Sequence, residues 1–212
     1  MIETDQMNTW RGDFGKSYTD RNPKTVEDVE ALALHNYGVS QTSLNERFLS
    51  DIPKSANILE VGCNVGSQLA VLAEMGYHNL YGIELQRYAV EIAKHNLPGI
   101  DVIEGSAFDI PFKDNFFDLV FTSGVLIHIS PEDLHLVIAE IVRCSRSFIW
   151  GFEYFSAEEE VIPYRGHDAL AWKTNFSQVF LKLAPELMLI QEEEIPYLSS
   201  PNVDVMYLLK KG

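Results

Sequence analysis

The segment Glu60–Gly66, with the sequence EVGCNVG, combines residue types and a spacing that indicate ligand binding. Glycine adopts backbone conformations closed to other residues and lets a ligand lie against bare backbone. A helix that begins directly after such a turn presents free N–H groups. The spacing differs from the GxGxxG turn that holds a pyrophosphate, and no lysine follows as in a P-loop. The segment therefore indicates a nucleoside ligand that lacks a pyrophosphate.

Three further polar positions fall at the ends of later apolar runs. Glu84 follows by about 20 residues, where a carboxylate can accept the protons of both ribose hydroxyls. Gly105–Phe108 offers a hydroxyl, a backbone N–H and an aromatic ring to an adenine. Asp118–Gly124 ends at the same edge of the sheet, at which open α/β sheets bind ligands. Together these positions predict one nucleoside crevice.

Short apolar runs that alternate with helical periods must position these residues. The runs are continuous rather than alternating, as in parallel strands that are covered on both faces. Strands are expected at Asn57–Val61, Leu80–Glu84, Val102–Glu104, Asp118–Thr122, Phe148–Phe152, Met188–Gln191 and Val203–Leu209. Helices are expected at Ser67–Met75, at Gln86–His95, from Ser130 onward and around Phe176–Leu183. The pattern predicts an α/β fold with a Rossmann-like, seven-stranded, mostly parallel sheet, helices on both faces and an N-terminal helical extension.

Three stretches of this pattern resemble a known family. LEVGCNVGSQL, YGIELQRYAVEIA and EGSAFDIPFKDNFFDLVFTSGVLIHI, followed by the terminal pair of strands, are similar to class I S-adenosylmethionine-dependent methyltransferases over about Ser55–Gly212. The resemblance implies S-adenosylmethionine as the cofactor and methyl transfer as the activity. It implies that Gly62 and its neighbours contact the methionine part, Glu84 the ribose, and Ser106 the adenine. Many relatives have an aspartate at the place of Ser106, and a serine accepts a hydrogen bond less strongly.

Residues 1–54 read as a helical extension or lid, and residues 55–212 as one compact methyltransferase unit. Trp10, Phe14 and Tyr18 beside Arg11 and Arg21 are unusual for a frayed terminus. They could close over the cleft, with Tyr18 or Arg21 binding the cofactor carboxylate; alternatively, the rings pack the first helices onto the sheet. The expected cofactor-binding residues are Tyr18, Arg21, Glu60, Gly62, Cys63, Asn64, Gly66, Glu84, Leu85, Ser106, Ala107, Phe108, Thr122 and Ser123.

A narrower resemblance rests on the N-terminus. NTWRGDFG, at residues 8–15, and YTDRN, at residues 18–22, are similar to a small group of methyltransferases associated with pseudaminic acid biosynthesis. Members of this group are encoded with enzymes of amino-sugar pathways. The resemblance implies a polar small-molecule acceptor, such as an amino-sugar or nucleotide-sugar derivative.

Three stretches compete for the acceptor side of the cleft. His128 lies in an apolar stretch, where a histidine is often structural. Glu153 follows the fifth strand, and Tyr164–Lys173 lies in a long connection that is either functional or a surface loop of mixed polarity. We expect His128, Glu153 or His167 to act as a base for an oxygen or nitrogen acceptor, and carbon methylation stays open. The expected substrate-binding residues are Trp10, Phe14, Tyr154, Tyr164, Arg165 and Lys173.

The chain of 212 residues carries 16 Lys and Arg against 31 Asp and Glu, a formal net charge of −15. An anionic surface repels phosphate backbones, which disfavours a nucleic-acid substrate. Cys63 and Cys144 are far apart and form no CxxC pattern, so no metal site is expected. No run approaches the roughly 18 apolar residues of a membrane span, and no signal-peptide run begins the chain. We therefore expect a cytoplasmic protein, monomeric or homodimeric.

Two other functions are weighed against methyl transfer. A Rossmann oxidoreductase predicts GxGxxG where this chain has ExGxxxG. A non-catalytic module that binds S-adenosylmethionine would keep the crevice without an aligned acceptor pocket. The sequence leaves this second alternative open.

Overall fold

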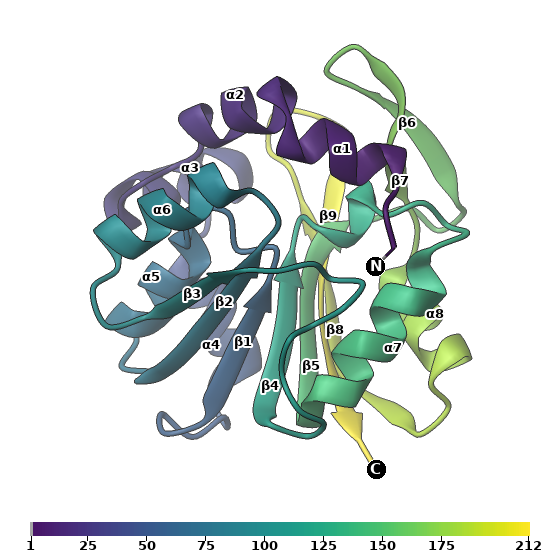
Figure 1. Cartoon of the computed structure of the whole chain (residues 1–212). Coiled ribbons are helices and arrows are strands. Elements are labelled where there is room, and N and C mark those ends of the chain that lie inside the picture. Colours follow the sequence, from purple (N-terminus) through teal and green to yellow (C-terminus); the bar gives the residue numbers. More distant parts are fainter. Residues whose placement is uncertain (1) are drawn as a thin grey trace.

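The computed structural model describes residues 2–212. Seven strands form one sheet in the order β3-β2-β1-β4-β5-β9-β8 (Figure 1). Strands β1 to β5 are parallel to one another, and β9 is antiparallel to both of its neighbours. The strands are β1 (Asn57–Val61), β2 (Asn79–Glu84), β3 (Asp101–Glu104), β4 (Phe117–Ser123), β5 (Ser145–Tyr154), β8 (Leu187–Pro196) and β9 (Val203–Lys211). This order confirms the predicted Rossmann-like, mostly parallel sheet.

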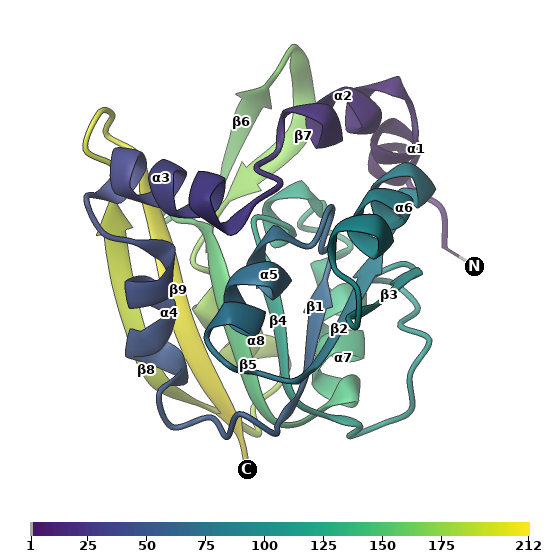
Figure 2. The ribbon, with the colours of Figure 1, turned by 90° about the vertical axis from the view of Figure 1, so that its left-hand side faces the viewer.

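Helices cover both faces of the sheet, as the continuous apolar strands predict (Figure 2). Successive strand residues point to opposite faces. In β5, Trp150 therefore belongs to one buried cluster and Ile149 to the other. The helices are α4 (Gln41–Leu49), α5 (Ser67–Glu74) and α6 (Arg87–Asn96) on the first face, and α7 (Leu134–Cys144) and α8 (Phe176–Leu183) on the second.

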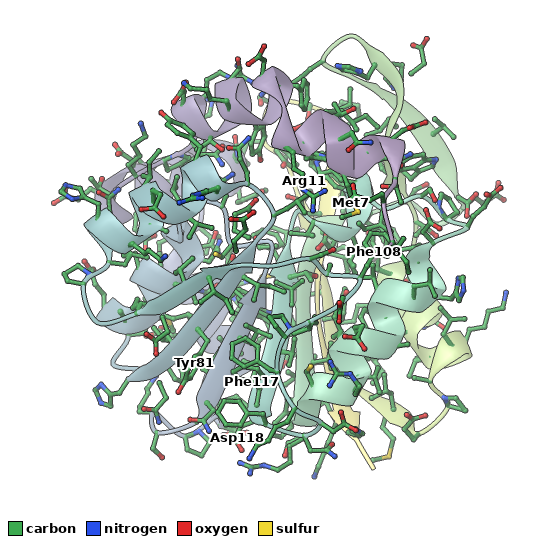
Figure 3. All side chains as sticks on the ribbon, viewed as in Figure 1. Met7, Arg11, Tyr81, Phe108, Phe117 and Asp118 are labelled. Carbon is green, nitrogen blue, oxygen red and sulfur yellow. The ribbon has the colours of Figure 1, made fainter. Side chains whose placement is uncertain are left out.

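Three N-terminal helices precede the sheet: α1 (Asp5–Arg11), α2 (Asp13–Arg21) and α3 (Val26–Tyr37). Helices α1 and α2 lie across the carboxyl ends of the parallel strands (Figure 1). Met7 is 4% exposed and shares a buried cluster with Phe108. Figure 3 shows both side chains near this edge, whereas Tyr81, Phe117 and Asp118 lie toward the opposite edge. The first helix is thus anchored in the core beside the end of the sheet at which ligands are expected.

Capping side chains mark the beginnings of α3 and α4. The Thr25 hydroxyl accepts from the Asp28 N–H at 3.1 Å, and the Ser40 hydroxyl accepts from the Ser43 N–H at 3.1 Å. Helix α7 begins later than the predicted Ser130, because residues 131–133 form a turn ahead of it. None of the helices in residues 2–212 is long and apolar enough to cross a membrane.

A β-hairpin occupies the long connection between β5 and α8, where no strand is predicted from the sequence. Strands β6 (Glu160–Tyr164) and β7 (His167–Lys173) pair outside the main sheet and rise above its carboxyl edge (Figure 1). The turn is two residues long, and Arg165 and Gly166 have φ of 49° and 89°. Two positive φ angles in a two-residue loop are the geometry that matches the twist of a hairpin. The hairpin tip brings Tyr164 and Arg165 toward the N-terminal helices.

Candidate active site

A cavity of about 690 Å³ lies along the carboxyl ends of the strands, beneath α1 and α2. Its walls come from the glycine turn after β1, the ends of β2, β4 and β5, the tip of the β6–β7 hairpin and the beginning of β9. Within residues 2–212, five of the seven buried side-chain polar atoms without a hydrogen-bond partner belong to residues that line it. These residues are Trp10, Glu60, Gln68, Glu153 and Asp204. Buried polar groups are normally paired, so the cavity is suited to a polar ligand.

The glycine turn after β1 has a backbone that few residues can adopt. Gly62 has φ of 75°, Asn64 of 47° and Gly66 of 79°. The Gly62 and Cys63 N–H groups both donate to the Ile83 carbonyl, at 2.8 and 3.0 Å, which fixes the turn against β2. A Cβ at Gly62 would lie 2.7 Å from Cγ2 of Val125. The turn is therefore confined by the segment after β4 as well as by its own backbone.

We expect Gly62→Ala to destabilise the protein more than Gly76→Ala does. Both glycines have positive φ, which costs an alanine about 1–2 kcal/mol. Only Gly62 would also press a methyl group against Val125, because nothing lies within 4 Å of a Cβ at Gly76. Chemical unfolding of both variants measures the difference. Adding Val125→Ala to Gly62→Ala should recover part of the lost stability. An equal loss of stability in Gly62→Ala and Gly76→Ala would contradict the expected clash.

Glu84, at the end of β2, is 9% exposed and lines the cavity. Its Oε2 accepts from the Asn64 N–H at 2.9 Å, and its Oε1 accepts from the Gln86 N–H at 2.7 Å. Burial raises the pKa of Glu84, against the lowering effect of these N–H groups. A carboxylate has about four acceptor positions, so each oxygen retains one for a ligand hydroxyl. Glu84 therefore holds the turn and faces the ligand at the same time.

Glu60, at the end of β1, is 3% exposed, and its Oε2 has no partner among the described residues. Burial and the neighbouring Glu84 raise its pKa well above the usual range. Gln68, in the first turn of α5, also lines the cavity with an unpaired side-chain oxygen. This end of the cavity is thus rich in acceptors and suits a ligand with several N–H and O–H groups.

Buried side-chain hydrogen bonds hold α2 against the glycine turn. Thr19 is fully buried; its hydroxyl donates to Gln86 Oε1 at 3.0 Å and accepts from Asn64 Nδ2 at 2.9 Å. Gln86 Nε2 donates to the Trp10 carbonyl at 2.9 Å. A Cβ at Gly15 would lie 1.8 Å from that carbonyl oxygen, so only glycine permits this approach. The N-terminal helices are therefore part of the cavity wall and are not a frayed terminus.

His128 lies between the N-terminal helices and the hairpin. Its ring centroid is 4.6 Å from that of Trp10 and 4.8 Å from that of Tyr164. Nδ1 lies 2.7 Å from the Leu170 carbonyl oxygen, which can only accept, so Nδ1 carries the proton and Nε2 the lone pair. Burial lowers the pKa of His128 to about 4, so the ring is neutral at pH 7.

Glu153, at the end of β5, is 1% exposed and lines the cavity beside His128 in the same wall. Its Oε1 accepts from the N–H groups of Val125 and Leu126 at 3.1 and 3.3 Å, and its Oε2 has no partner among the described residues. Burial raises the pKa of Glu153 to about 7, although these hydrogen bonds lower it. The carboxyl group can therefore exchange a proton near neutral pH.

Most residues that the sequence singled out line this one cavity. They are Trp10, Tyr18, Arg21, Glu60, Gly62, Cys63, Asn64, Glu84, Leu85, Ser106, Ala107, Phe108, Ser123, His128, Glu153, Tyr154, Tyr164 and Arg165. The structure therefore brings together segments that are distant in sequence, and their individual roles stay predictions. The lining also includes residues that the sequence analysis missed, among them Asn22, Tyr37, Gln41, Gln68, Val125, Tyr197 and Asp204.

Five of the expected site residues lie outside the lining. Gly66 is the N-cap residue of α5, and Thr122, in β4, is 2% exposed and does not line the cavity. Phe14 and His167 pack on each other with ring centroids 4.9 Å apart, and Lys173 donates to Asn202 at 2.8 Å. His167 is exposed and contacts Phe14 outside the cavity lining, so its role as a base stays a prediction. Within residues 2–212, no group of three His, Cys, Asp or Glu side chains is arranged to hold a metal ion.

Comparisons with known proteins match this architecture. Residues 59–147 match the family model described as a methyltransferase domain. Phthiotriol/phenolphthiotriol dimycocerosates methyltransferase 1 of Mycobacterium ulcerans is 34% identical over 92 residues, which cover 42% of this chain and 33% of the relative. The alignments to this and two other curated relatives cover less than half of those relatives' own length.

Solved structures share the fold at low sequence identity. The 1,6-didemethyltoxoflavin-N1-methyltransferase of Burkholderia thailandensis, with bound 1,6-didemethyltoxoflavin and S-adenosylhomocysteine, has a TM-score of 0.74 at 15% identity over 100% of this chain and 92% of that one. The [4+2]-cyclase SpnF has a TM-score of 0.63 at 17% identity over 80% of each chain. These identities show the fold alone. Residues 59–147 thus match a methyltransferase domain, and the strand order of the whole chain is that of a Rossmann-like methyltransferase fold.

Proposed function

We propose that this protein is an S-adenosylmethionine-dependent methyltransferase that acts on a polar small molecule, of the amino-sugar or nucleotide-sugar type. The observation that carries the proposal is the acceptor-rich end of the cavity, where Glu60, Gln68 and Glu84 surround the glycine turn. The sugar-type substrate rests on the N-terminal resemblance and on the polar lining of the cavity.

The lining fits this cofactor group by group. Glu84 retains acceptor positions for the two ribose hydroxyls, and the unpaired oxygens of Glu60 and Gln68 accept from further N–H or O–H groups. Donors also line the cavity, since Trp10 Nε1 is buried without a partner among the described residues and Arg21 belongs to the lining. A ligand with an amino group, a carboxylate and a ribose would satisfy both walls. Ser106 would meet the adenine with a hydroxyl that already accepts from the Phe108 N–H at 3.2 Å.

The chain's own residues align the acceptor and receive its proton. When bound, S-adenosylmethionine supplies a methyl group on a positively charged sulfur. With Glu60, Gln68 and Glu84 holding the cofactor, its methyl group would pass to the acceptor atom, and sulfur would keep the electron pair of the carbon–sulfur bond. The acceptor's proton moves to Oε2 of Glu153, which has no other partner among the described residues. Tyr18, Tyr164 and His128 exclude water above this point, and fixed orientation alone can supply roughly 7–11 kcal/mol of the barrier in favourable cases.

We expect S-adenosylmethionine and S-adenosylhomocysteine to bind and NAD not to bind, because the turn lacks the third glycine of a pyrophosphate site. Isothermal titration calorimetry of the purified chain measures all three. Heat from NAD with none from S-adenosylhomocysteine would overturn the proposal. A screen of free and nucleotide-linked amino sugars with methyl-labelled cofactor then identifies the acceptor.

A second candidate is a protein that binds the cofactor and performs no methyl transfer. The similarity to a [4+2]-cyclase favours keeping it, because this fold hosts chemistry other than methyl transfer. The two candidates differ in one measurement. Cofactor binding without transfer of label to any metabolite of a cell extract supports the second.

A further inference from the structure

A cluster of three tyrosines and one aspartate, Tyr37, Tyr154, Tyr197 and Asp204, lines the cavity at the beginning of β9. The Tyr37 and Tyr197 hydroxyls both donate to Asp204 Oδ2, at 2.5 and 2.9 Å. The ring centroids of Tyr37 and Tyr197 are 4.9 Å apart, and those of Tyr154 and Tyr197 are 6.1 Å apart. We call these four residues the tyrosine–aspartate cluster. It contains one of the residues predicted from the sequence, Tyr154.

The carboxylate of this cluster is incompletely paired. Asp204 is 5% exposed, and its Oδ1 has no hydrogen-bond partner among the described residues. Both phenol donors are directed to Oδ2. Lys173 donates to Asn202 at 2.8 Å; its charge lowers the pKa of Asp204, but burial still raises that pKa to about 6. Burial of a carboxylate is costly unless donors or a counter-charge satisfy it. A cavity-lining carboxylate with one free oxygen is therefore set to receive a donor from a ligand.

The tyrosine rings distinguish between two kinds of ligand donor, an ammonium and a hydroxyl. A cation is attracted to the faces of aromatic rings, and the Lys173 ammonium already lies 5.0 Å from the Tyr154 ring centroid. A neutral hydroxyl gains from the carboxylate but not from the rings. A carboxylate beside three tyrosines thus favours an ammonium over a hydroxyl.

We propose that the tyrosine–aspartate cluster binds an ammonium group of the acceptor substrate. This inference rests on the proposed function and makes its substrate class specific. A neighbouring carboxylate favours the protonated form of an amine, so the bound nitrogen keeps its proton and has no lone pair to attack a methyl group. The ammonium is therefore the anchor, and the methyl group goes to a different atom of the same substrate.

The position of the cluster agrees with an anchor set apart from the reacting atom. Tyr154 pairs with Asp204 across β5 and β9, and Glu153 pairs with Val205. Glu153 and Tyr154 are consecutive residues of β5, and both line the cavity. A substrate with an amine and a hydroxyl on one small ring can address both groups.

The test compares trans-2-aminocyclohexanol with trans-cyclohexane-1,2-diol, which differ only in an amino group against a hydroxyl. Binding of each to the chain saturated with S-adenosylhomocysteine is measured by ligand-observed NMR titration at pH 7. We expect the amine to bind at least about tenfold more tightly, because both probes can donate a hydrogen bond to Asp204 but only the ammonium adds a charge–charge attraction to it. Asp204→Asn, which keeps the shape and removes the charge, should abolish this preference. Asp101→Asn, an exposed acid on β3 outside the cavity, should leave it unchanged.

Equal binding of the two probes, no binding of the amine, or a preference that survives in Asp204→Asn would each overturn the inference. The comparison of probes on the unmodified chain decides the matter even where Asp204→Asn does not fold. Calorimetry with S-adenosylhomocysteine separates this failure from that of the proposed function. If S-adenosylhomocysteine binds but the amine is not preferred, only the inference about the ammonium site is wrong. If S-adenosylhomocysteine does not bind, the proposed function is wrong.

Discussion

Replacing Glu84 by alanine is expected to lower the affinity for S-adenosylhomocysteine by at least about tenfold. The carboxylate would lose two charge-assisted hydrogen bonds to the ribose, each worth roughly 1.5–3 kcal/mol, and the smaller figure for one bond already gives that factor. The variant also frees the Asn64 and Gln86 N–H groups, which loosens the glycine turn. Calorimetry gives the affinity, and circular dichroism with thermal melting verifies that the fold survives.

The neighbouring strand offers a matched control for this experiment. Glu104 is the in-register partner of Glu84 at the end of β3, it is exposed, and it does not line the cavity. Glu104→Ala should therefore leave the affinity unchanged. A folded Glu84→Ala protein that binds as tightly as the Glu104→Ala protein would show that the ribose is held elsewhere.

Replacing Glu153 by glutamine is expected to lower turnover of an identified acceptor by about 10²–10⁴-fold, the usual contribution of a positioned base. Of the two candidate bases that line the cavity, Glu153 has a pKa of about 7, near the working pH, whereas that of His128 is about 4. The profile of kcat/KM against pH reports the base of the free enzyme. With Glu153 as the base, the rate falls tenfold per pH unit below about 7. A limb near pH 4, or full turnover in Glu153→Gln, would assign the role to His128.

The same group makes stability depend on pH before any acceptor is known. Burial raises the pKa of Glu153 from 4.5 to about 7, so the folded state binds the proton more tightly than the unfolded chain does. The stability contributed by the protonated group is complete below pH 4.5 and is lost as the pH rises to about 7. Glu153→Gln does not titrate, so its melting temperature relative to the unmodified chain should increase between pH 5 and pH 8. Glu158→Gln, at an exposed position, should show no such trend.

The cofactor end of the cavity was predictable because its determinants are local. Gly62 and Gly66 need positive φ, and Glu84 ends the next strand, so one short stretch of sequence carries the geometry. The tyrosine–aspartate cluster was not predictable in this way. Tyr37 and Asp204 are 167 positions apart and meet because β9 lies beside β5 and α3 packs near its beginning. The spacing of polar residues along the chain does not predict such a long-range contact.

The β6–β7 hairpin was missed for a different reason. Its strands are short, and Val161 is 58% exposed, so the alternation of apolar and polar residues that marks a half-buried strand is weak. The signal that was available is the dipeptide Arg165–Gly166, whose two positive φ angles make a tight turn. His167 was predicted as a candidate base because it lies in this long connection. In the hairpin it pairs with Tyr164 and packs on Phe14.

Asn64 contacts both the crevice and α2, so it couples ligand binding to the docking of the N-terminal helices. Its backbone N–H bonds to Glu84 in the crevice, while its side chain bonds to Thr19 in α2 and to Asn22 at the end of α2. A ligand that stabilises this turn must therefore tighten the docking of residues 5–21 by the same free energy with which that docking tightens the ligand. Ligand binding in the crevice should therefore slow the amide hydrogen exchange of α2. Substitutions such as Thr19→Val should weaken ligand binding without touching the ligand.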